Sequence, residues 1–224
     1  MEIQWLGHAC FKISDQGYSV VIDPYNSRYT EGYPELHTEA DKVLVSHEHY
    51  GHNCREAVKL SGRGEEGNPF RITSFPVDHD SVGGIMRGQC LVHVIESGGV
   101  KIAHMADIGT QLNGGEISKL SNLDAILVTA GSLTGLPSQE IWRMFEELFP
   151  RVLIPMHYRD GSRGARRLET VSDLVNYFED PSFAVEYDTD TIRITANMTP
   201  QIAVLKYAGS KGKSVFPRFA GFRK

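Results

Sequence analysis

The sequence is poor in cysteine and has no apolar run that approaches the length of a transmembrane helix. Its three cysteines, Cys10, Cys54 and Cys90, are far apart and form no Cys-x-x-Cys pair. An odd number of widely spaced cysteines argues against a disulfide framework, so we expect reduced thiols. The N-terminus also lacks the basic and then apolar pattern of a signal peptide. These absences predict a cytoplasmic protein with no membrane segment.

The 224-residue chain also lacks internal repeats, low-complexity segments and an excess of positive charge. Its formal net charge of −5 argues against general binding to nucleic acid. With 41% hydrophobic residues, the chain can bury one sizeable core. We expect one domain over residues 1–207 and a basic, phenylalanine-containing tail over residues 208–224. Packing of the tail on the body, packing on a second copy in a homo-oligomer, and contact with nucleic acid are all open.

Alternating and continuous apolar segments predict an α/β organisation. Strands are expected over residues 2–6, 10–13, 18–22, 91–96, 100–103, 124–128 and 151–155. Apolar residues at helical spacing predict one helix between Pro137 and Pro150 and another over residues 168–178. A short helix is also expected over residues 53–60. Strands with helices outside them suggest two sheets packed face to face, with helices covering both.

Three histidines, His47, His49 and His52, fall within six positions directly after the apolar run 42–45. Imidazole is the commonest protein ligand for zinc-class metals near neutral pH. In an extended segment, side chains at i and i+2 share a face, so His47 and His49 can point at the same spot. Gly51 lets the chain turn, and His52 then approaches from another side. The cluster predicts a metal site, and a histidine-rich surface loop is the alternative.

The segment Ser46–His52 resembles the His-x-His-x-Asp-His signature of the metallo-β-lactamase superfamily, except that Gly51 stands in place of the aspartate. Further segments resemble the branch that contains ascorbate-6-phosphate lactonase and related metal-dependent hydrolases. These segments are Ile3–Phe11, Val21–Pro24, Phe75–His79, Ile102–Gly109 and Ile154–Tyr158. The resemblance extends over residues 1 to 180 and implies a four-layer αβ/βα sandwich of two mixed β-sheets flanked by helices.

The resemblance also implies a set of metal ligands for one or two Zn²⁺ ions, with Mn²⁺ or Fe²⁺ as alternatives. This set is His47, His49 and His79 at a first metal, His52 and His157 at a second, and Asp107 between the two. A bound metal lowers the pKa of its water from about 16 towards 7, and the resulting hydroxide would attack a carbonyl or phosphoryl centre. Asp107 and His157 are thus the expected catalytic residues of a metal-dependent hydrolase.

Gly51 removes a charged ligand from the second site, because the family aspartate supplies a carboxylate oxygen there. We therefore expect a weakened second site, to which Gly51→Asp would add metal affinity. A single-metal enzyme, a second site completed by Asp78 or Asp80, and impaired chemistry are all open. A metallonuclease and a catalytically impaired metal- or ligand-binding protein are the alternative functions.

Basic residues crowd the segment just after His157. They are Arg159, Arg163, Arg166 and Arg167. Guanidinium groups bind phosphate and carboxylate bidentately, so we predict a small anionic or phosphorylated substrate held by Arg163 and Arg166. A solvated basic loop is the alternative. His8 and His104 lie in segments that resemble the family, and we expect them to contact substrate or to orient a ligand.

Overall fold

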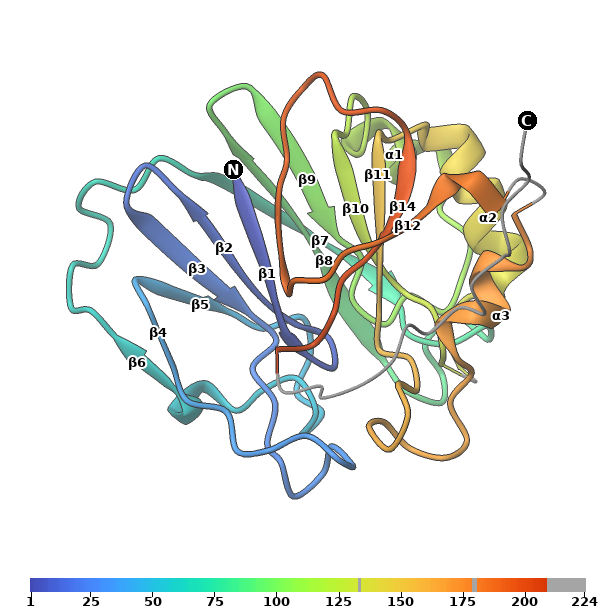
Figure 1. The fold of residues 1–224 in the computed structure, drawn as a ribbon, viewed down its shortest axis with the longest axis horizontal. Helices are drawn as coiled ribbons and strands as arrows, with labels where there is room; N and C mark the ends of the chain where they lie inside the picture. The colour runs from blue at the N-terminus through green and yellow to red at the C-terminus, as the bar shows by residue number, and fades with distance from the viewer. Residues whose placement is uncertain (133, 179–180, 209–224) are drawn as a thin grey trace.

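Two large β-sheets dominate the computed structural model, which describes residues 1–132, 134–178 and 181–208 (Figure 1). The first sheet has five strands in the order β13-β1-β2-β3-β5. Its strands are β1 (Glu2–Gly7), β2 (Cys10–Asp15), β3 (Tyr18–Ile22), β5 (Lys42–Leu44) and β13 (Thr191–Arg193). The predicted strands over residues 2–6, 10–13 and 18–22 are confirmed as β1, β2 and β3, which are antiparallel neighbours, and β5 pairs with β3 in parallel.

The second sheet has seven strands in the order β12-β14-β11-β10-β9-β8-β7. Its strands are β7 (Arg71–Asp78), β8 (Gln89–Ser97), β9 (Val100–His104), β10 (Ala125–Thr129), β11 (Val152–Met156), β12 (Ala184–Glu186) and β14 (Gln201–Val204). β7, β8 and β9 are antiparallel, whereas β9, β10, β11, β14 and β12 are parallel neighbours. The predicted strands over residues 91–96 and 100–103 are β8 and β9, and Gly98 and Gly99 form the hairpin turn between them.

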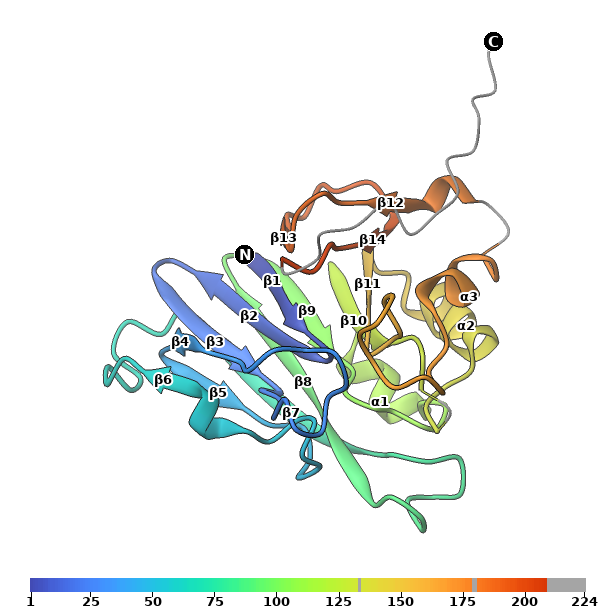
Figure 2. The ribbon, with the colours of Figure 1, turned by 60° about the horizontal axis from the view of Figure 1, so that its bottom comes forward.

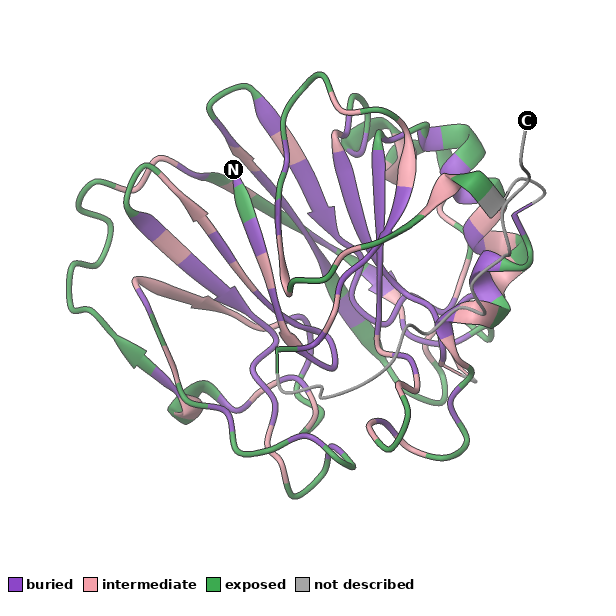
Figure 3. Ribbon diagram, in the orientation of Figure 1, coloured by how far each residue is buried: buried purple, intermediate pink, exposed green. Residues whose placement is uncertain are grey.

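The two sheets pack face to face around one hydrophobic core (Figures 2 and 3). Trp5 and Phe11 enter this core from the first sheet, and Ile102 enters it from the second. β10, expected from its continuous apolar run to be a central strand, is buried along its whole length. Burial of apolar surface contributes about 25 cal/mol per Å², so these strands hold the scaffold that positions the loops at their ends.

Helices connect the strands of the second sheet. They are α1 (Gly114–Lys119), α2 (Ser138–Leu148) and α3 (Val171–Val175). α2 buries Ile141, Met144, Phe145 and Leu148 on one face, which confirms the predicted stripe. α3 is shorter than the predicted segment 168–178, because the N–H groups of Tyr177 and Phe178 bond to carbonyls three residues back instead of four. Phe178 nevertheless packs on Trp142 of α2, with ring centroids 4.5 Å apart.

The outer face of the first sheet differs from the expected helical cover. The described α-helices all lie in connections between strands of the second sheet, and Figures 1 and 2 place α2 and α3 on that side. The predicted helix over residues 53–60 is instead a 3₁₀ turn (Arg55–Ala57) followed by β6 (Val58–Leu60). β6 pairs with β4 (Thr38–Ala40), and this ladder takes the backbone hydrogen bonds that a helix would have made. The outer layer over the first sheet is therefore thin.

Other expectations concern the cysteines and the C-terminal tail. Cys10, Cys54 and Cys90 are all buried and free of disulfide bonds, as predicted. A second 3₁₀ turn (Pro181–Phe183) precedes β12. Within the described ranges, no helix combines the length and hydrophobicity needed to cross a membrane. The predicted basic tail falls almost entirely on residues 209–224, which lie outside the described residues.

Candidate metal centre

The predicted metal ligands meet where strands of both sheets end. His8 follows β1, Asp23 follows β3, His47 to His52 follow β5, His79 follows β7, Asp107 follows β9 and His157 follows β11. Parallel strands carry their carboxyl ends to the same edge of a sheet, which is where ligand sites of α/β proteins form. The parallel pairs β3–β5, β9–β10 and β10–β11 therefore gather these loops at one end of the molecule.

His47, His49 and His79 form the first group. Their ligand nitrogens all lie within 4.8 Å of one another. The tract after β5 is a loop and not an extended strand, yet the His47 and His49 rings still converge, with centroids 4.6 Å apart. His79 reaches the same place from the end of β7, 4.7 Å from the His47 ring. Three imidazoles on one side leave a fourth position open, which is the pattern of a catalytic zinc site.

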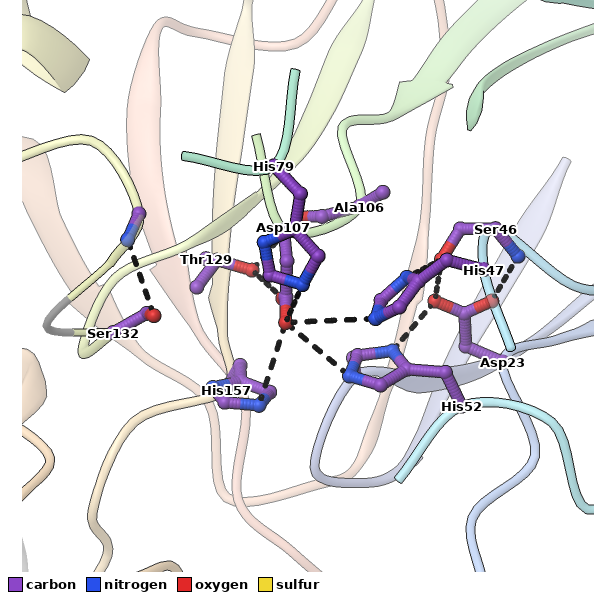
Figure 4. Close-up of polar contacts among 12 residues, drawn as sticks. Asp23, Ser46, His47, His52, His79, Ala106, Asp107, Thr129, Ser132 and His157 are labelled. Carbon is purple, nitrogen blue, oxygen red and sulfur yellow. Dashed lines mark hydrogen bonds and ion pairs between the residues drawn. The ribbon is translucent and has the colours of Figure 1, made fainter. Parts of the chain in front are cut away.

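The Asp107 carboxylate lies in the middle of the histidines (Figure 4). Its Oδ2 is 3.3 Å from Nε2 of His52, 3.7 Å from Nε2 of His79, 3.8 Å from Nε2 of His157 and 4.0 Å from Nε2 of His47. Thr129, at the end of β10, donates a hydrogen bond of 2.9 Å to the other oxygen, Oδ1. Asp107 therefore stands between the two histidine groups, as a bridging ligand must.

Asp23 orients the histidines from behind, a role that we did not predict from the sequence. It is fully buried, and its carboxylate accepts hydrogen bonds from Ser46 N (2.7 Å), Ser46 Oγ (2.6 Å) and His52 Nδ1 (2.9 Å). The Ser46 hydroxyl also lies 2.9 Å from His47 Nδ1. Burial opposes ionisation of Asp23, but its bonds to His52 outweigh burial and lower its pKa to about 2. With the Nδ1 atoms held in this way, the Nε2 atoms of both rings face the centre.

The donor set fits a zinc-class metal. At this cluster, the buried nitrogens without a hydrogen-bond partner among the described residues include His8 Nδ1, His47 Nε2, His79 Nδ1 and Nε2, and His157 Nδ1. Burial holds the pKa of His47 at about 3 and lowers the pKa of His157, so these rings are neutral and can donate lone pairs. Burial also disfavours a charged His52, but the Asp107 and Asp23 carboxylates outweigh it and raise its pKa to about 10. A metal at His52 must therefore displace a proton.

A cavity of about 360 Å³ opens onto this cluster. Its wall includes Arg87 and Arg167, and neither guanidinium has a salt-bridge partner in the described part of the chain. Arg163, predicted to bind substrate, instead pairs with Asp160 at 2.7 Å and lies over the Tyr207 ring at 5.1 Å. Arg166 and Arg167 are both exposed, but Arg166 does not line the cavity. The loop after His157 therefore reaches the cavity, but through Arg167 and not through Arg163 or Arg166.

Three other residues need correction or confirmation. His104 is fully buried, its Nε2 lies 3.0 Å from Ala9 O, and its Nδ1 accepts a bond from Ala106 N, so it cannot contact a substrate. Asp80 cannot complete a metal site, because backbone N–H groups of the following loop surround its carboxylate, including that of Arg87 at 2.8 Å. Glu48 is exposed and pairs with Arg55 at 2.6 Å, so its carboxylate is engaged outside the cluster.

Positive φ angles occur at the edge of the sheets that carries the histidine cluster. Four residues other than glycine have positive φ angles at this edge: His8 (55°), Asp23 (50°), Ala106 (53°) and His157 (54°). Such conformations cost free energy and persist where the surrounding structure imposes them, which is common at functional sites. His8, Asp23 and His157 each follow a strand immediately, and Ala106 lies two residues after β9, directly before Asp107. The sequence carries no local signal for these angles.

Comparisons with known proteins agree with the geometry. A family model described as the β-lactamase superfamily domain matches residues 2–157. A protein named UPF0173 metal-dependent hydrolase from Methanopyrus kandleri is 29% identical over 195 residues, which cover 70% of this chain and 84% of the relative. Another of that name, from Thermus thermophilus, is 25% identical over 207 residues, covering 75% of this chain and 91% of the relative.

A solved structure shares the architecture. The crystal structure of a protein described as a Zn-dependent hydrolase of the metallo-β-lactamase superfamily, from Thermotoga maritima, matches with a TM-score of 0.72 and 25% identity. The match covers 91% of this chain and 97% of that chain. The family model spans most of the described sequence, including every histidine and carboxylate of the cluster from His8 to His157. The chain therefore belongs to the β-lactamase superfamily and has the metallo-β-lactamase fold.

Proposed function

We propose that this chain is a zinc-dependent hydrolase that cleaves a lactone, ester, amide or phosphoester of a small anionic molecule, as the lactonase-like resemblance suggests. The observation that carries the proposal is the placement of Arg87 and Arg167 in the wall of the same cavity as the histidines and Asp107. Guanidinium groups bind phosphate or carboxylate through paired hydrogen bonds, so these two arginines can hold an anionic group. The bond to be cleaved then lies over the cluster.

The residues of the cluster divide the work. When bound, zinc-class ions supply a nucleophile at neutral pH and a positive charge for the developing oxyanion. His47, His49 and His79 would hold a first ion, with Asp107, His52 and His157 at a second. Thr129 fixes the Asp107 carboxylate, and Asp23 fixes the His52 ring. The metal-ligating atoms of Asp107 and His52 are therefore positioned before a metal binds.

The size of the cavity favours a small molecule. About 360 Å³ is within the range of small-molecule pockets. The formal net charge of −5 would oppose a polynucleotide, so a nuclease is not our proposal. The three free, buried cysteines suit a reducing compartment, and we propose the cytoplasm.

Two neighbouring arginines provide the test. Arg167→Gln and Arg166→Gln remove the same charge from adjacent positions, but only Arg167 lines the cavity. For hydrolysis of a phosphorylated ester, we expect Arg167→Gln to raise KM by at least about tenfold, the effect of losing one charge-assisted contact of about 1.5–3 kcal/mol. Arg166→Gln should leave KM near the wild-type value. Neither change should affect hydrolysis of an uncharged ester.

The contrary results are equally clear. If Arg167→Gln and Arg166→Gln change KM equally, the loop after His157 is a solvated basic loop and does not bind the substrate. Loss of activity on charged and uncharged esters alike, with metal content intact, would show that Arg167 does not act through the anionic group. An absence of metal-dependent hydrolysis across phosphomonoesters, phosphorylated lactones and carboxylate esters would refute the proposed reaction class.

A further inference from the structure

Gly51 leaves a space beside the second group of histidines, and the ring of His8 fills it. An ideal Cβ built on Gly51 would lie 3.0 Å from His8 Cε1, 3.6 Å from its Nε2 and 3.7 Å from its Nδ1. The contact with Cε1 is tighter than ordinary van der Waals separation, so any side chain at position 51 requires the His8 ring to shift by a few tenths of an ångström. Gly51 does not have a positive φ, so backbone conformation does not require glycine there.

The His8 ring is aimed at His52 and His157. Its centroid lies 4.0 Å from that of His157 and 5.0 Å from that of His52. One ligand nitrogen from each of the three rings falls within 4.8 Å of the others. His8 is 8% exposed, and its Nδ1 has no hydrogen-bond partner among the described residues. A buried imidazole that lies beside two other imidazoles and has a nitrogen without a hydrogen-bond partner has the features of a metal ligand.

The backbone holds His8 in this place. Its carbonyl oxygen accepts hydrogen bonds from Trp5 Nε1 (3.0 Å) and from His157 N (3.1 Å), which tie it to the segment of another proposed ligand. Gly7 precedes it with φ +108°, and a Cβ on Gly7 would lie 2.7 Å from the Tyr33 ring. The turn after β1 is therefore built to present the residue at position 8 inward, at a φ of 55° that costs free energy.

We propose that His8 is the third nitrogen ligand of the second metal, in the place where the family motif has an aspartate. This inference rests on the two-metal centre of the proposed function. His8, His52 and His157 then mirror His47, His49 and His79, with Asp107 between the groups. Imidazole suits zinc, copper, iron and nickel, whereas carboxylate-rich sites suit manganese and magnesium. The exchange of a carboxylate for His8 should shift the second site towards Zn²⁺ and Co²⁺ and away from Mn²⁺.

Metal titration of the full chain tests this ligand without reference to activity. We expect wild-type protein to bind two equivalents of Co²⁺ tightly. His8→Asn keeps a residue that tolerates positive φ but cannot reach as far as imidazole. This variant should retain one tight equivalent, which also shows that it folds, and should bind the second at least about tenfold more weakly. His37→Ala is the matched control, because the His37 side chain is 78% exposed and lies outside the cluster.

Exchange of the two positions makes the test sharper. Gly51→Asp alone should not add affinity, contrary to the expectation from sequence, because its Cβ would lie 3.0 Å from His8 Cε1 and would push the His8 ring out of its present position. Combined with His8→Asn, Gly51→Asp should restore the second equivalent and raise its relative affinity for Mn²⁺. In wild-type protein, the second equivalent should also protect His8 from diethyl pyrocarbonate, as mapped by mass spectrometry.

Several results would overturn the inference. His8 is excluded as a ligand if His8→Asn still binds two equivalents of Co²⁺ tightly, or if wild-type protein binds only one. It is also excluded if wild-type protein loaded with two equivalents is modified at His8 as fast as metal-free wild-type protein. These outcomes are separate from failure of the proposed function. If the metal counts follow the expected pattern but no anionic substrate is hydrolysed, the proposed substrate is wrong and the ligand assignment stands.

Discussion

Asparagine in place of Asp23 separates the orientation of the metal ligands from their identity. Asp23 is not among the proposed metal ligands, yet its carboxylate accepts hydrogen bonds from Ser46 N, Ser46 Oγ and His52 Nδ1 at 2.6–2.9 Å. Asparagine has the same shape and tolerates the φ of 50° at this position, so the change adds no backbone strain. If its oxygen keeps the bond from Ser46 N, its amino group replaces the acceptor that faced Ser46 Oγ and His52.

The magnitude follows from these contacts. A hydrogen bond to a charged group contributes about 1.5–3 kcal/mol, and Ser46 Oγ can rotate to find another partner. We therefore expect the free energy of unfolding of metal-free Asp23→Asn to fall by about 2–4 kcal/mol. Because the His52 ring loses its orienting acceptor, metal affinity at the second site should fall by about 10–100-fold. Urea unfolding measures the first quantity, and competition with a chromophoric chelator measures the second.

Asp41→Asn is the matched control for this experiment. The Asp41 side chain is 5% exposed and accepts bonds from Ser19 N (2.7 Å) and Ser61 Oγ (2.6 Å), but it lies at the start of β5, away from the cluster. Its loss should lower stability and leave metal affinity unchanged. If Asp23→Asn binds both metals as tightly as Asp41→Asn does, then Asp23 does not orient His52 and the reasoning fails.

Two further predictions concern the first metal and the acid limit of stability. His49→Ala should remove one tight equivalent of metal per chain without unfolding the protein, since His49 is exposed and is one of three ligands at the first site; wild-type stoichiometry after dialysis would contradict its role. For Asp41, burial opposes ionisation, but hydrogen bonds from Ser61 and Arg63 lower its pKa from 3.8 to about 2. A lowered pKa stabilises the fold above the unfolded value, so the difference in urea midpoint between wild type and Asp41→Asn should shrink as pH falls from about 4 towards 2. A constant difference over that range would refute the ionised state of Asp41.

The amino-acid sequence by itself was sufficient for the family, the main strands and the types of ligand. β10 could be predicted because its five residues are all apolar or β-branched, and α2 because its apolar residues recur with helical spacing. His79 and His157 follow strands directly, and His47, His49 and His52 lie in the loop after β5, so their convergence at one edge was a consequence of topology. These predictions depend on short segments of sequence, so small errors in the predicted ends of strands and helices do not change them.

Only the tertiary structure decided which side chains share a space. Arg167 and not Arg166 lines the cavity because the loop after His157 turns through Gly161 and Gly164, both at positive φ, and no sequence period describes such a turn. Helices cover the second sheet more than the first, because β6 takes up the chain where a helix was expected. In the sequence, Asp23 only marks the end of a predicted strand. Its role in orienting His47 and His52 arises because β5 pairs with β3 and brings Ser46 and His52 beside it.

Gly51 shows most clearly the difference between what the sequence and the tertiary structure each determine. Its sequence context marks a missing carboxylate and predicts a weakened second site. In the folded chain, the space beside it holds a ring that comes from a residue 43 positions earlier, since His8 and Gly51 lie in different loops. A motif records which side chain is absent from one segment, but ligand geometry depends on every segment that reaches the same point in space. Long-range packing sets that geometry, because the two sheets must close on one core before the loops at their ends can meet.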